Sequence, residues 1–440
     1  MGVTMLVPAL AIFAWIAVHR ISGFGPWLAD SLRRVIGVEG VARLEETVYG
    51  VEDRMNAVLR HGEKPRAYWE VPPEAPARAR AAGALVGPAV AAPSLVEALP
   101  SALAGPAAAA QAVAAQAVAA SELSLSALPV SAMQAPAASP RQLNLPRFRP
   151  SNVGPMFAEL DAPGDGRWVV LADDVGGDAR MYKTLLHPDV ERAWAELFVV
   201  ALDLRRVRLH FVPGTLEPQA TVDEALELPR PGRVPDEYHG SVIAAFNGGF
   251  KTEHGHYGTF LNGVTVVPPL TDTCTIALTK DNTLRIATWS KLEREAREGA
   301  WWRQTPGCMY ENGKINPRLA GGRVSKWGST IDGETVIRRS AMGLDAAGTT
   351  LFVGISNHTT APAIARGMRH AGAVSIAQLD INFSFPKFVT FRESAATKLK
   401  VAVPLAQGFE YTENEYLRRP SQRDFFYVMD ASMDGRTARN

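Results

Sequence analysis

Four polar residues follow two apolar runs in the last third of the chain. Asn357 and His358 come after the run TTLFVGIS, and Asp380 and Asn382 come at and just after the end of AVSIAQLD. Because APAIARGMRHAG between them has helical spacing, the segment predicts a strand–helix–strand unit with parallel neighbouring strands. Parallel strands end at one edge of a sheet, where open sheets bind ligands, so we expect these side chains to converge on one site. The alternative is that an Asp at a strand end only caps a turn.

A second cluster of candidate binding groups is the segment FNGGFKTEHGHYGTFLNG, residues 246–263. The apolar run SVIAAF leads directly into Asn247, Gly248 and Gly249. Adjacent glycines expose backbone amides, which suits phosphate or sugar oxygens. The competing interpretation is a plain hairpin, for which Asn-Gly is a common turn dipeptide.

The same segment contains two histidines that alternate around one glycine, His254 and His256. In an extended segment both imidazoles would point to the same side and reach one ligand. Two imidazoles are too few for a zinc site unless a carboxylate comes from elsewhere. We therefore predict a role in substrate binding for them, with no metal and no cofactor.

A third element is ETVIRRSAMGLD, which has two adjacent arginines in a predicted strand. Alternation along a strand sends Arg338 and Arg339 to opposite faces, so one of them can point inward. An inward guanidinium fits a phosphate or carboxylate through two parallel hydrogen bonds. The alternative is a structural ion pair with a nearby acid, namely Asp332, Glu334 or Asp345.

Composition and missing motifs exclude several classes of protein. Lys plus Arg number 46 against 45 Asp plus Glu, and this net charge of +1 gives no broad field to attract nucleic acid. The sequence has no G-x-S-x-G, P-loop, G-x-G-x-x-G or H-E-x-x-H motif, so serine hydrolase, nucleotide-binding and zincin chemistry have no local support. Only two cysteines occur, Cys274 and Cys308, which excludes a disulfide scaffold. They either pair outside the cytoplasm or, on the plainer interpretation, remain unbonded in the core.

After Pro146 the chain consists of short β-rich runs separated by Gly, Pro, Asn and Asp. Nine runs besides AVSIAQLD read as strands: RWVVLA, ELFVVALDL, RVRLHFV, SVIAAFN, GVTVVP, CTIALT, TLRIATW, ETVIRRSAMGL and TTLFVGIS. Two helices interrupt them, around 291–299 and 362–371. The expected fold class is α+β, a strand-dominated mixed-sheet domain over residues 143–432 that contains the strand–helix–strand unit.

The N-terminal third has three segments of different character. Residues 1–22 contain an uncharged apolar run, which predicts an uncleaved transmembrane signal anchor, with a buried helix of a soluble domain as the alternative. Residues 26–69 have apolar residues at helical spacing, interrupted at Gly37 and Gly40, and predict two juxtamembrane helices. We expect these helices to dock on the protein's own domain, with the membrane surface or self-association as alternatives. Residues 70–142 are rich in Ala and Pro and predict a disordered linker.

Three of these elements, in their order and spacing, resemble the phosphodiester glycosidase family. The family has an NGG-F turn, and this chain has Asn247–Phe250 there. The family's Arg-Thr-x-x-Gly strand corresponds to Arg339–Gly343. Its Asp-Gly-Gly-Gly-Ser loop corresponds to Leu379–Ser384. The stretch from Leu197 to Pro218 is similar to the family's opening strands, so the resemblance covers about Arg147 to Met429.

The resemblance implies hydrolysis of a sugar-phosphate diester at the glycosidic bond, in bacteria on envelope or exported polysaccharide. It implies that Asp380 acts as acid or base, that Arg339 holds the phosphate, and that Asn247 positions the sugar. The other polar residues of the clusters would then bind substrate: Gly248, Gly249, His254, His256, Asn357, His358, Asn382 and Ser384. This chain departs from the family where the glycine run is replaced by Ile381, Asn382 and Phe383. A catalytically inactive polysaccharide-binding or scaffold protein of the envelope is therefore the alternative.

The implied substrate decides the expected location of the domain. Three arginines follow the apolar run and none precedes it, which by the positive-inside rule would leave the domain in the cytoplasm: Arg20, Arg33 and Arg34. Because exported polysaccharide lies outside the cytoplasm, we expect a membrane-anchored, periplasmic domain instead. We also expect that removing everything before Leu143 leaves the midpoint of unfolding unchanged, since such a linker buries little apolar surface.

Overall fold

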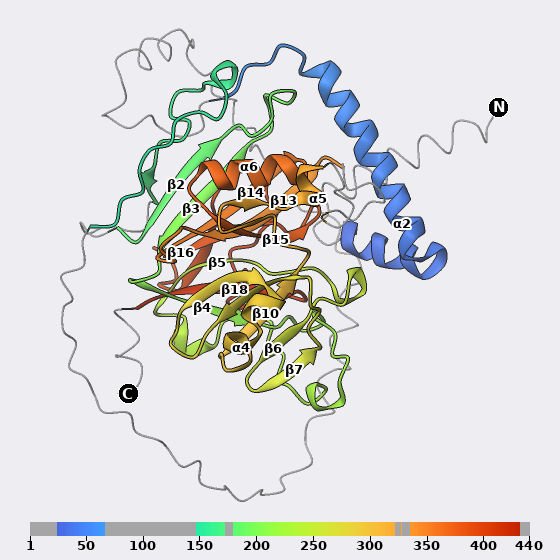
Figure 1. Ribbon diagram of the computed structural model, residues 1–440, viewed down its shortest axis with the longest axis vertical. Coiled ribbons are helices and arrows are strands. Elements are labelled where there is room, and N and C mark those ends of the chain that lie inside the picture. Colours follow the sequence, from blue (N-terminus) through green and yellow to red (C-terminus); the bar gives the residue numbers. More distant parts are fainter. Residues whose placement is uncertain (1–23, 67–146, 172–178, 322–326, 328–334, 432–440) are drawn as a thin grey trace, which may run out of the picture. The chain divides into compact units, whose positions relative to one another are not determined.

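In the computed structural model the described residues are 24–66, 147–171, 179–321, 327 and 335–431 (Figure 1). The predicted anchor, residues 1–22, and the predicted linker, residues 70–142, lie outside them. Within the described ranges, no helix has both the length and the apolar character needed to cross a membrane.

The strands of the described residues form three sheets. The eight-stranded sheet has the order β1 (Val169–Val170), β2 (Met181–Leu186), β3 (Leu197–Asp203), β14 (Thr350–Thr359), β13 (Ile337–Leu344), β15 (Ser375–Ile381), β11 (Tyr310–Glu311) and β12 (Lys314–Ile315). One five-stranded sheet has the order β17 (Lys400–Pro404), β16 (Phe388–Glu393), β5 (Val242–Asn247), β18 (Phe425–Asp430) and β4 (Val207–Val212). The other has the order β7 (Val264–Val267), β6 (Thr259–Leu261), β10 (Trp301–Thr305), β8 (Cys274–Leu278) and β9 (Leu284–Thr288).

The helices are few. The α-helices within the described residues are α2 (Phe24–Leu59), α4 (Trp289–Arg297), α5 (Pro317–Ala320) and α6 (Ala361–His370). Short 3-10 turns are η1 (Ala158–Leu160), η2 (Asp223–Ala225), η3 (Asp236–Tyr238) and η4 (Thr252–His254). Helix α6 begins where the Thr360 hydroxyl accepts a hydrogen bond from the Ala363 amide and Pro362 occupies the first turn. The strand-rich α+β character and the helices predicted near 291–299 and 362–371 are confirmed.

The predicted mixed sheet is wrong, because every strand pair in the three described sheets is antiparallel. The strand–helix–strand unit exists as β14, α6 and β15, but its strands are not neighbours. Strand β13 lies between them and pairs antiparallel with both. β14 and β15 therefore run in the same direction while a strand from earlier in the chain separates their ends.

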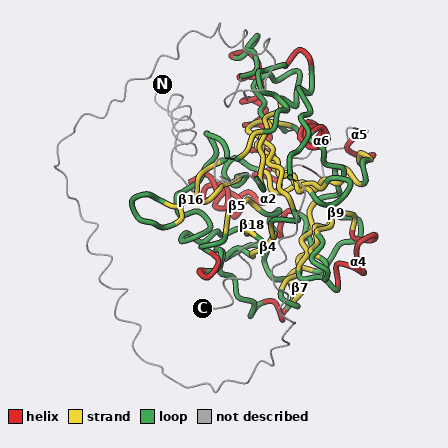
Figure 2. The backbone as a smooth tube through the Cα atoms, turned by 90° about the vertical axis from the view of Figure 1, so that its left-hand side faces the viewer, coloured by secondary structure: helices red, strands yellow, loops and turns green. Residues whose placement is uncertain are grey.

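The eight-stranded sheet is buried on both faces, and alternation along its strands divides the core. Met342 of β13 packs with Phe246 and Phe426 of a five-stranded sheet. Its neighbour Ala341 packs on the opposite face with Ile364 of α6. Figure 2 shows α6 and α4 beside separate groups of strands. Helix α4 packs on the outer side of the β8 and β10 strands in a cluster of its own.

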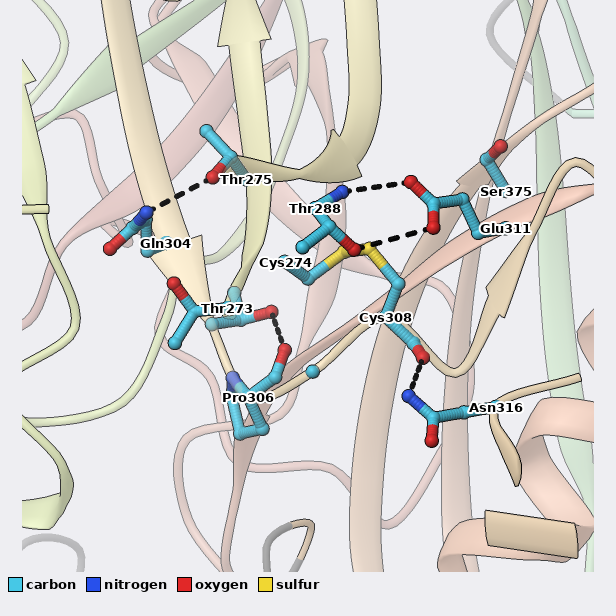
Figure 3. The surroundings of a disulfide bond; sticks show 12 residues. Thr273, Cys274, Thr275, Thr288, Gln304, Pro306, Cys308, Glu311, Asn316 and Ser375 are labelled. Carbon is cyan, nitrogen blue, oxygen red and sulfur yellow. Dashed lines mark hydrogen bonds between the residues drawn. A yellow bond between two sulfur atoms is a disulfide. The ribbon is translucent and has the colours of Figure 1, made fainter. Parts of the chain in front are cut away.

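Cys274 and Cys308 form a disulfide, with Cα atoms 4.6 Å apart (Figure 3). The expectation of two unbonded core thiols is therefore wrong. Cys274 begins β8, and Cys308 follows β10, which pairs with β8 and so brings the two thiols together. The bond closes a loop with a sequence separation of 34 residues. Asn316 then fixes the segment after Cys308 by donating to its carbonyl at 2.9 Å.

Helix α2 contacts the strand domain, as the sequence predicted, and bends at Gly37, where φ is 74°. Arg192 donates to both carboxylate oxygens of Asp53, at 2.9 and 2.7 Å, and His358 Nε2 lies 3.1 Å from the same carboxylate. Although burial works against it, these hydrogen bonds hold the pKa of Asp53 below its usual value. Tyr49 packs against a cluster that includes Phe250, and burial raises the pKa of its hydroxyl.

Removing residues 1–142 should therefore lower the stability of the domain, which corrects the expectation of an unchanged midpoint. The truncation deletes the contact of the half-buried Tyr49 and leaves Arg192 and His358 without Asp53. We expect a loss of about 2 kcal/mol, or about 4–8 °C in Tm, measured by calorimetry. The matched control deletes only residues 70–142 and keeps α2. An equal loss in that control would show that the linker, and not α2, stabilises the domain.

Candidate functional site

The candidate site is built around Asp380 near the end of β15. Arg339 of β13 pairs with Ile381, but Ala341 pairs with Gln378, so β15 has one extra residue at this point. Such a bulge bends a strand and redirects its side chains. The Asp380 amide donates to the Gly248 carbonyl at 3.0 Å, which joins the bulge to the end of β5.

The Asp380 carboxylate faces a guanidinium from the last strand. Its Oδ2 lies 2.7 Å from Arg423 Nη2, and Asp380 is only 2% exposed. Burial raises the pKa of Asp380 to about 6, the nearby Asp424 charge adds to this, and Arg423 opposes it. Arg423 Nη2 also donates to the Gly249 carbonyl at 3.2 Å, whereas Asp380 Oδ2 and Arg423 Nε have no hydrogen-bond partner among the described residues. These are unused donor and acceptor groups in a buried site.

A second buried ion pair lies directly behind the first. Arg303 of β10 donates from Nε to Asp424 Oδ2 at 2.8 Å, and both side chains are almost fully buried. The other Arg303 nitrogens donate to the carbonyls of Tyr257, Gln304 and Phe250. Arg423 and Asp424 are consecutive, so one short segment before β18 supplies one charge to each pair.

The two glycines after β5 are required by this packing. The Gly248 amide donates to the Asp424 carbonyl at 2.9 Å, and the Gly249 amide donates to Asp424 Oδ2 at 3.2 Å. A Cβ at Gly248 would lie 2.6 Å from the Asp424 carbonyl oxygen, and one at Gly249 would lie 2.9 Å from the Arg303 guanidinium. The prediction that these amides are exposed to a ligand is therefore wrong, and so is the plain hairpin.

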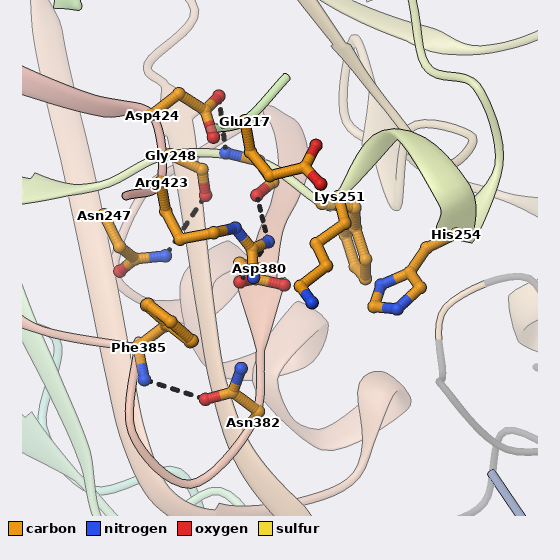
Figure 4. A network of polar contacts seen from close by, with 12 residues as sticks. Glu217, Asn247, Gly248, Lys251, His254, Asp380, Asn382, Phe385, Arg423 and Asp424 are labelled. Carbon is orange, nitrogen blue, oxygen red and sulfur yellow. Dashed lines mark hydrogen bonds and ion pairs between the residues drawn. The ribbon is translucent and has the colours of Figure 1, made fainter. Parts of the chain in front are cut away.

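Asn247 joins two sheets beneath the site. Its side-chain amide donates to the Ser340 hydroxyl at 2.8 Å, and its oxygen accepts from the Lys387 amide at 3.1 Å. Ser340 in turn donates to the Asp380 carbonyl at 2.8 Å. Asn247, Gly248 and Asp380, which the sequence placed in one site, do lie together (Figure 4). Asn247 supports the site, because its side chain is already occupied by protein partners.

The segment after the glycines adds a cation beside Asp380. The Lys251 charge acts to lower the pKa of Asp380, and Figure 4 shows the Lys251 ammonium beside that carboxylate, with His254 further out. Glu217 anchors this segment by accepting from the Thr252 amide at 2.9 Å. His254 ends the 3-10 turn η4 and His256 has a φ of 49°, so the predicted extended alternation of the two histidines is wrong. His256 is exposed.

The loop after β15 is an ordered turn. The Asn382 side-chain oxygen accepts from the Ser384 and Phe385 amides, both at 2.7 Å. Phe385 packs on the Arg423 guanidinium at 4.8 Å from the ring centroid. Phe383 packs on Arg338 at 3.9 Å, which holds the loop in place. Asn382 and Ser384 thus shape the border of the site through the turn they form.

Arg339, predicted to hold phosphate, does not reach this site. It is fully buried, and its guanidinium donates to the carbonyls of Thr359, Trp327 and Thr335. Burial lowers its pKa to about 9. Of the acids proposed as ion-pair partners, Asp345 is not among its hydrogen-bond partners, and Asp332 and Glu334 lie outside the described residues. Strand alternation places Arg339 on the α6 face of β13, whereas Ser340 faces Asn247 and the candidate site.

Asn357 and His358, predicted to converge with Asp380, are used elsewhere. Asn357 accepts from the Glu196 amide at 2.9 Å and donates to the Glu196 carboxylate at 2.9 Å. His358 contacts Asp53 of α2. The intervening strand β13 separates the end of β14 from the end of β15, so the convergence expected of neighbouring strands does not occur.

Sequence reasoning missed the charged residues that act on Asp380 and the residues that hold them in place: Lys251, Arg423 and Asp424, with Arg303 paired to Asp424 and Phe385 packed on Arg423. The single available signal was the adjacent Arg-Asp pair immediately before the apolar run FFYVMD. No group of three or more His, Cys, Asp or Glu side chains in the described part of the chain is arranged to hold a metal ion.

Comparisons with known proteins give similar solved structures but no family. No family model matches the sequence, and no curated protein matches it either. A zebrafish N-acetylglucosamine-1-phosphodiester alpha-N-acetylglucosaminidase catalytic domain, auto-inhibited by its pro-peptide, is similar with a TM-score of 0.36 and 12% identity, covering 58% of this chain and 85% of that one. A putative exported protein from Burkholderia pseudomallei has a TM-score of 0.34 and 10% identity, covering 53% of this chain and 74% of that one. A hypothetical protein from Synechocystis has a TM-score of 0.29 and 10% identity, covering 54% of this chain and 59% of that one.

Proposed function

We propose that this protein hydrolyses a sugar-phosphate diester at the glycosidic bond, acting on envelope or exported polysaccharide outside the cytoplasm. The observation that carries the proposal is the buried pair of Asp380 and Arg423 beside Lys251. A carboxyl whose pKa is raised to about 6 can exchange a proton near neutral pH. Two cations beside it suit the single negative charge of a phosphodiester.

Asp380 is best suited to act as a general base. The bond to be broken joins the anomeric carbon to a phosphate oxygen, and a phosphate ester anion is a weak base that leaves without prior protonation. The difficult step is therefore the attack of water. Asp380 would accept the water proton while the water oxygen bonds to the anomeric carbon, and the electron pair of the broken bond leaves with the phosphate.

Arg423 and Lys251 would hold the phosphate group. Arg423 Nε has no hydrogen-bond partner in the described part of the chain, so it remains able to donate. Negative charge collects on the phosphate as it leaves, and fixed cations stabilise that state more than the bound substrate. Because Asp380 is 2% exposed, a substrate must displace the half-buried Phe385 or Lys251 side chain to reach it.

A second candidate function rests on the loop after β15. Ile381, Asn382 and Phe383 stand where the family has its glycines, and the rings of Phe383 and Phe385 each pack on an arginine. A loop fixed in this way would keep the site closed to the phosphate, while the surrounding surface still binds polysaccharide. This observation favours a catalytically inactive binding or scaffold protein as the alternative. Saturable binding of an anomeric phosphodiester without turnover would identify it.

A pair of arginine substitutions tests the proposed role of Arg423. Arg423→Lys keeps the charge but loses the planar fork, so it should weaken inhibition by inorganic phosphate about tenfold while inhibition by the free sugar changes little. The measurement is the inhibition constant of each compound against turnover of an anomeric phosphodiester with a chromogenic leaving group. Arg339→Lys is the matched control, and it should lower Tm without discriminating between the two inhibitors. Equal behaviour of the two variants would remove Arg423 from phosphate binding.

A further inference from the structure

Helix α2 has a regular stripe of exposed apolar side chains after its bend. Successive members are spaced by four, three, four and three residues, and each side chain is exposed to solvent. They are Leu44 (45% exposed), Val48 (36%), Val51 (43%), Met55 (56%) and Val58 (76%). This is the spacing of a coiled coil, in which apolar residues alternate between heptad positions d and a. Here positions 44, 51 and 58 are d, and positions 48 and 55 are a.

From Leu44 onward this stripe is exposed, and the contacts that dock α2 come from the other side of the helix; Val41, at the a position one heptad earlier, is buried. Asp53 and Tyr49, which dock α2, occupy heptad positions f and b, on the side away from the stripe. A docked surface helix normally buries its apolar side and exposes its polar side. In α2 the arrangement is reversed, and a row of exposed apolar side chains on a folded protein marks an interaction surface.

We propose that α2 pairs with α2 of a second copy of this chain in a parallel two-stranded coiled coil. The stripe is its own complement, since a two-fold axis parallel to the helix sets each a and d residue against the same residue of the partner. Val48 at an a position and Leu44 at a d position follow the preference for two strands, which Val51, Met55 and Val58 do not share. This inference is independent of the catalytic proposal.

The charges beside the stripe select the parallel direction. The flanking e positions are Glu45 and Glu52, and the flanking g positions are Thr47 and Arg54. An antiparallel pair brings e residues to e residues, so glutamate meets glutamate in either register that aligns the stripes. A parallel pair brings Thr47 to Glu52 of the partner subunit and Arg54 to Leu59 of the partner subunit, with no like charges in contact.

The docking of α2 makes so short a coil feasible. The segment from Leu44 to Leu59 is about 24 Å long, and isolated helices of this length are marginal in water because ordering them is costly. Here α2 is already ordered by its contacts with Arg192 and His358. Pairing therefore gains the burial of the apolar stripe without the cost of forming the helix.

Cysteine cross-linking of the full chain in nonionic detergent tests both pairing and direction. Because Cys274 and Cys308 are bonded to each other, Val51→Cys introduces the single free thiol. In a parallel coil this d position faces its own copy, so mild oxidation should convert most of the protein to a covalent dimer on a non-reducing gel. Ala57→Cys is the matched control, exposed on the same helix but off the stripe, and it should cross-link at least about fivefold less.

The mass in solution provides an independent measurement. Light scattering should give the mass of two chains for the unmodified protein and of one chain for the double variant Val51→Glu, Met55→Glu. The melting temperature of the variant at high dilution should match that of the unmodified protein, since both side chains are exposed in the single chain. A single-chain mass for the unmodified protein, or equal cross-linking of the two cysteine variants, would overturn the proposal. Either result would mean that this chain's own remaining residues, or lipid, cover the stripe.

Discussion

Replacing Asp380 by asparagine should lower kcat/KM toward an anomeric phosphodiester at least about a hundredfold, the usual contribution of a general base. The substitution keeps the shape of the side chain and its backbone hydrogen bond to Gly248, but it removes the group that accepts the water proton. The melting temperature at neutral pH should change little. Removing the buried carboxylate charge of Asp380 stabilises the fold, because that charge is costly to bury. Leaving Arg423 without its counter-charge destabilises the fold, so the two effects oppose each other.

The pH dependence of the unmodified enzyme should follow the titration of the same group. A base must be ionised, so kcat/KM should rise about tenfold per pH unit up to about pH 6 and level off above it, because burial raises the pKa of Asp380 to about 6. If Asp380 instead acted as an acid, the rate would fall over that range. Glu293→Gln, at an exposed pair with Arg297, is the control and should keep both rate and profile.

Stability should change with pH in the opposite direction to activity. The folded protein holds the Asp380 proton up to about pH 6, whereas the unfolded chain loses it near the ordinary value of 3.8. Between these values the folded state binds more protons, so the free energy of unfolding falls as pH rises, by about 3 kcal/mol. Urea unfolding at pH 4 and pH 8 should show a larger fall for the unmodified protein than for Asp380→Asn. Identical pH dependence of the two proteins, together with full activity of the variant, would show that Asp380 is neither buried as described nor the base.

Sequence reasoning located Asp380 and the Asn247–Gly249 turn because both lie at the ends of strongly apolar strands. It failed at Arg339, since alternation shows that two adjacent arginines face opposite ways but cannot show which face holds the site. It failed at Asn357 and His358 because β13, from earlier in the chain, inserts between β14 and β15, and no local pattern predicts such an insertion. The bulge that redirects Asp380 is likewise a property of the pairing between strands.

Arg423 and Asp424 were missed for a related reason. They belong to no motif, and they reach Asp380 only because β18 pairs with β5 in the same sheet. The exposed apolar stripe of α2 was visible as helical spacing, but the sequence could not show which side of the helix the domain would bind. The residues that depend on long-range pairing are thus the ones that define the site, while local spacing was sufficient for the strands and the helices.

Asp424→Asn should be the most destabilising conservative substitution at the site, costing about 3–5 kcal/mol of unfolding free energy. It leaves the Arg303 guanidinium buried beside a neutral partner, and both side chains are now almost completely excluded from water. The loss should appear as a lower urea midpoint with an unchanged slope. Glu293→Gln, which makes the same chemical change at an exposed pair, should cost less than about 0.5 kcal/mol. A cost for Asp424→Asn as small as that of the control would mean that water reaches the Arg303 pair.

The same substitution should also move the pH profile of the enzyme, which separates the electrostatic role of Asp424 from its structural one. The negative charge of Asp424 helps to raise the pKa of Asp380. Without that charge, Asp380 should ionise at lower pH, and the rising part of the rate profile should shift below pH 6 in the fraction that remains folded. Arg303→Met, which breaks the same ion pair but retains the Asp424 carboxylate, should be similarly unstable, yet its profile should not shift downward. A downward shift in both variants would assign the effect to loosening of the site, and no shift in either would show that Asp424 does not influence Asp380.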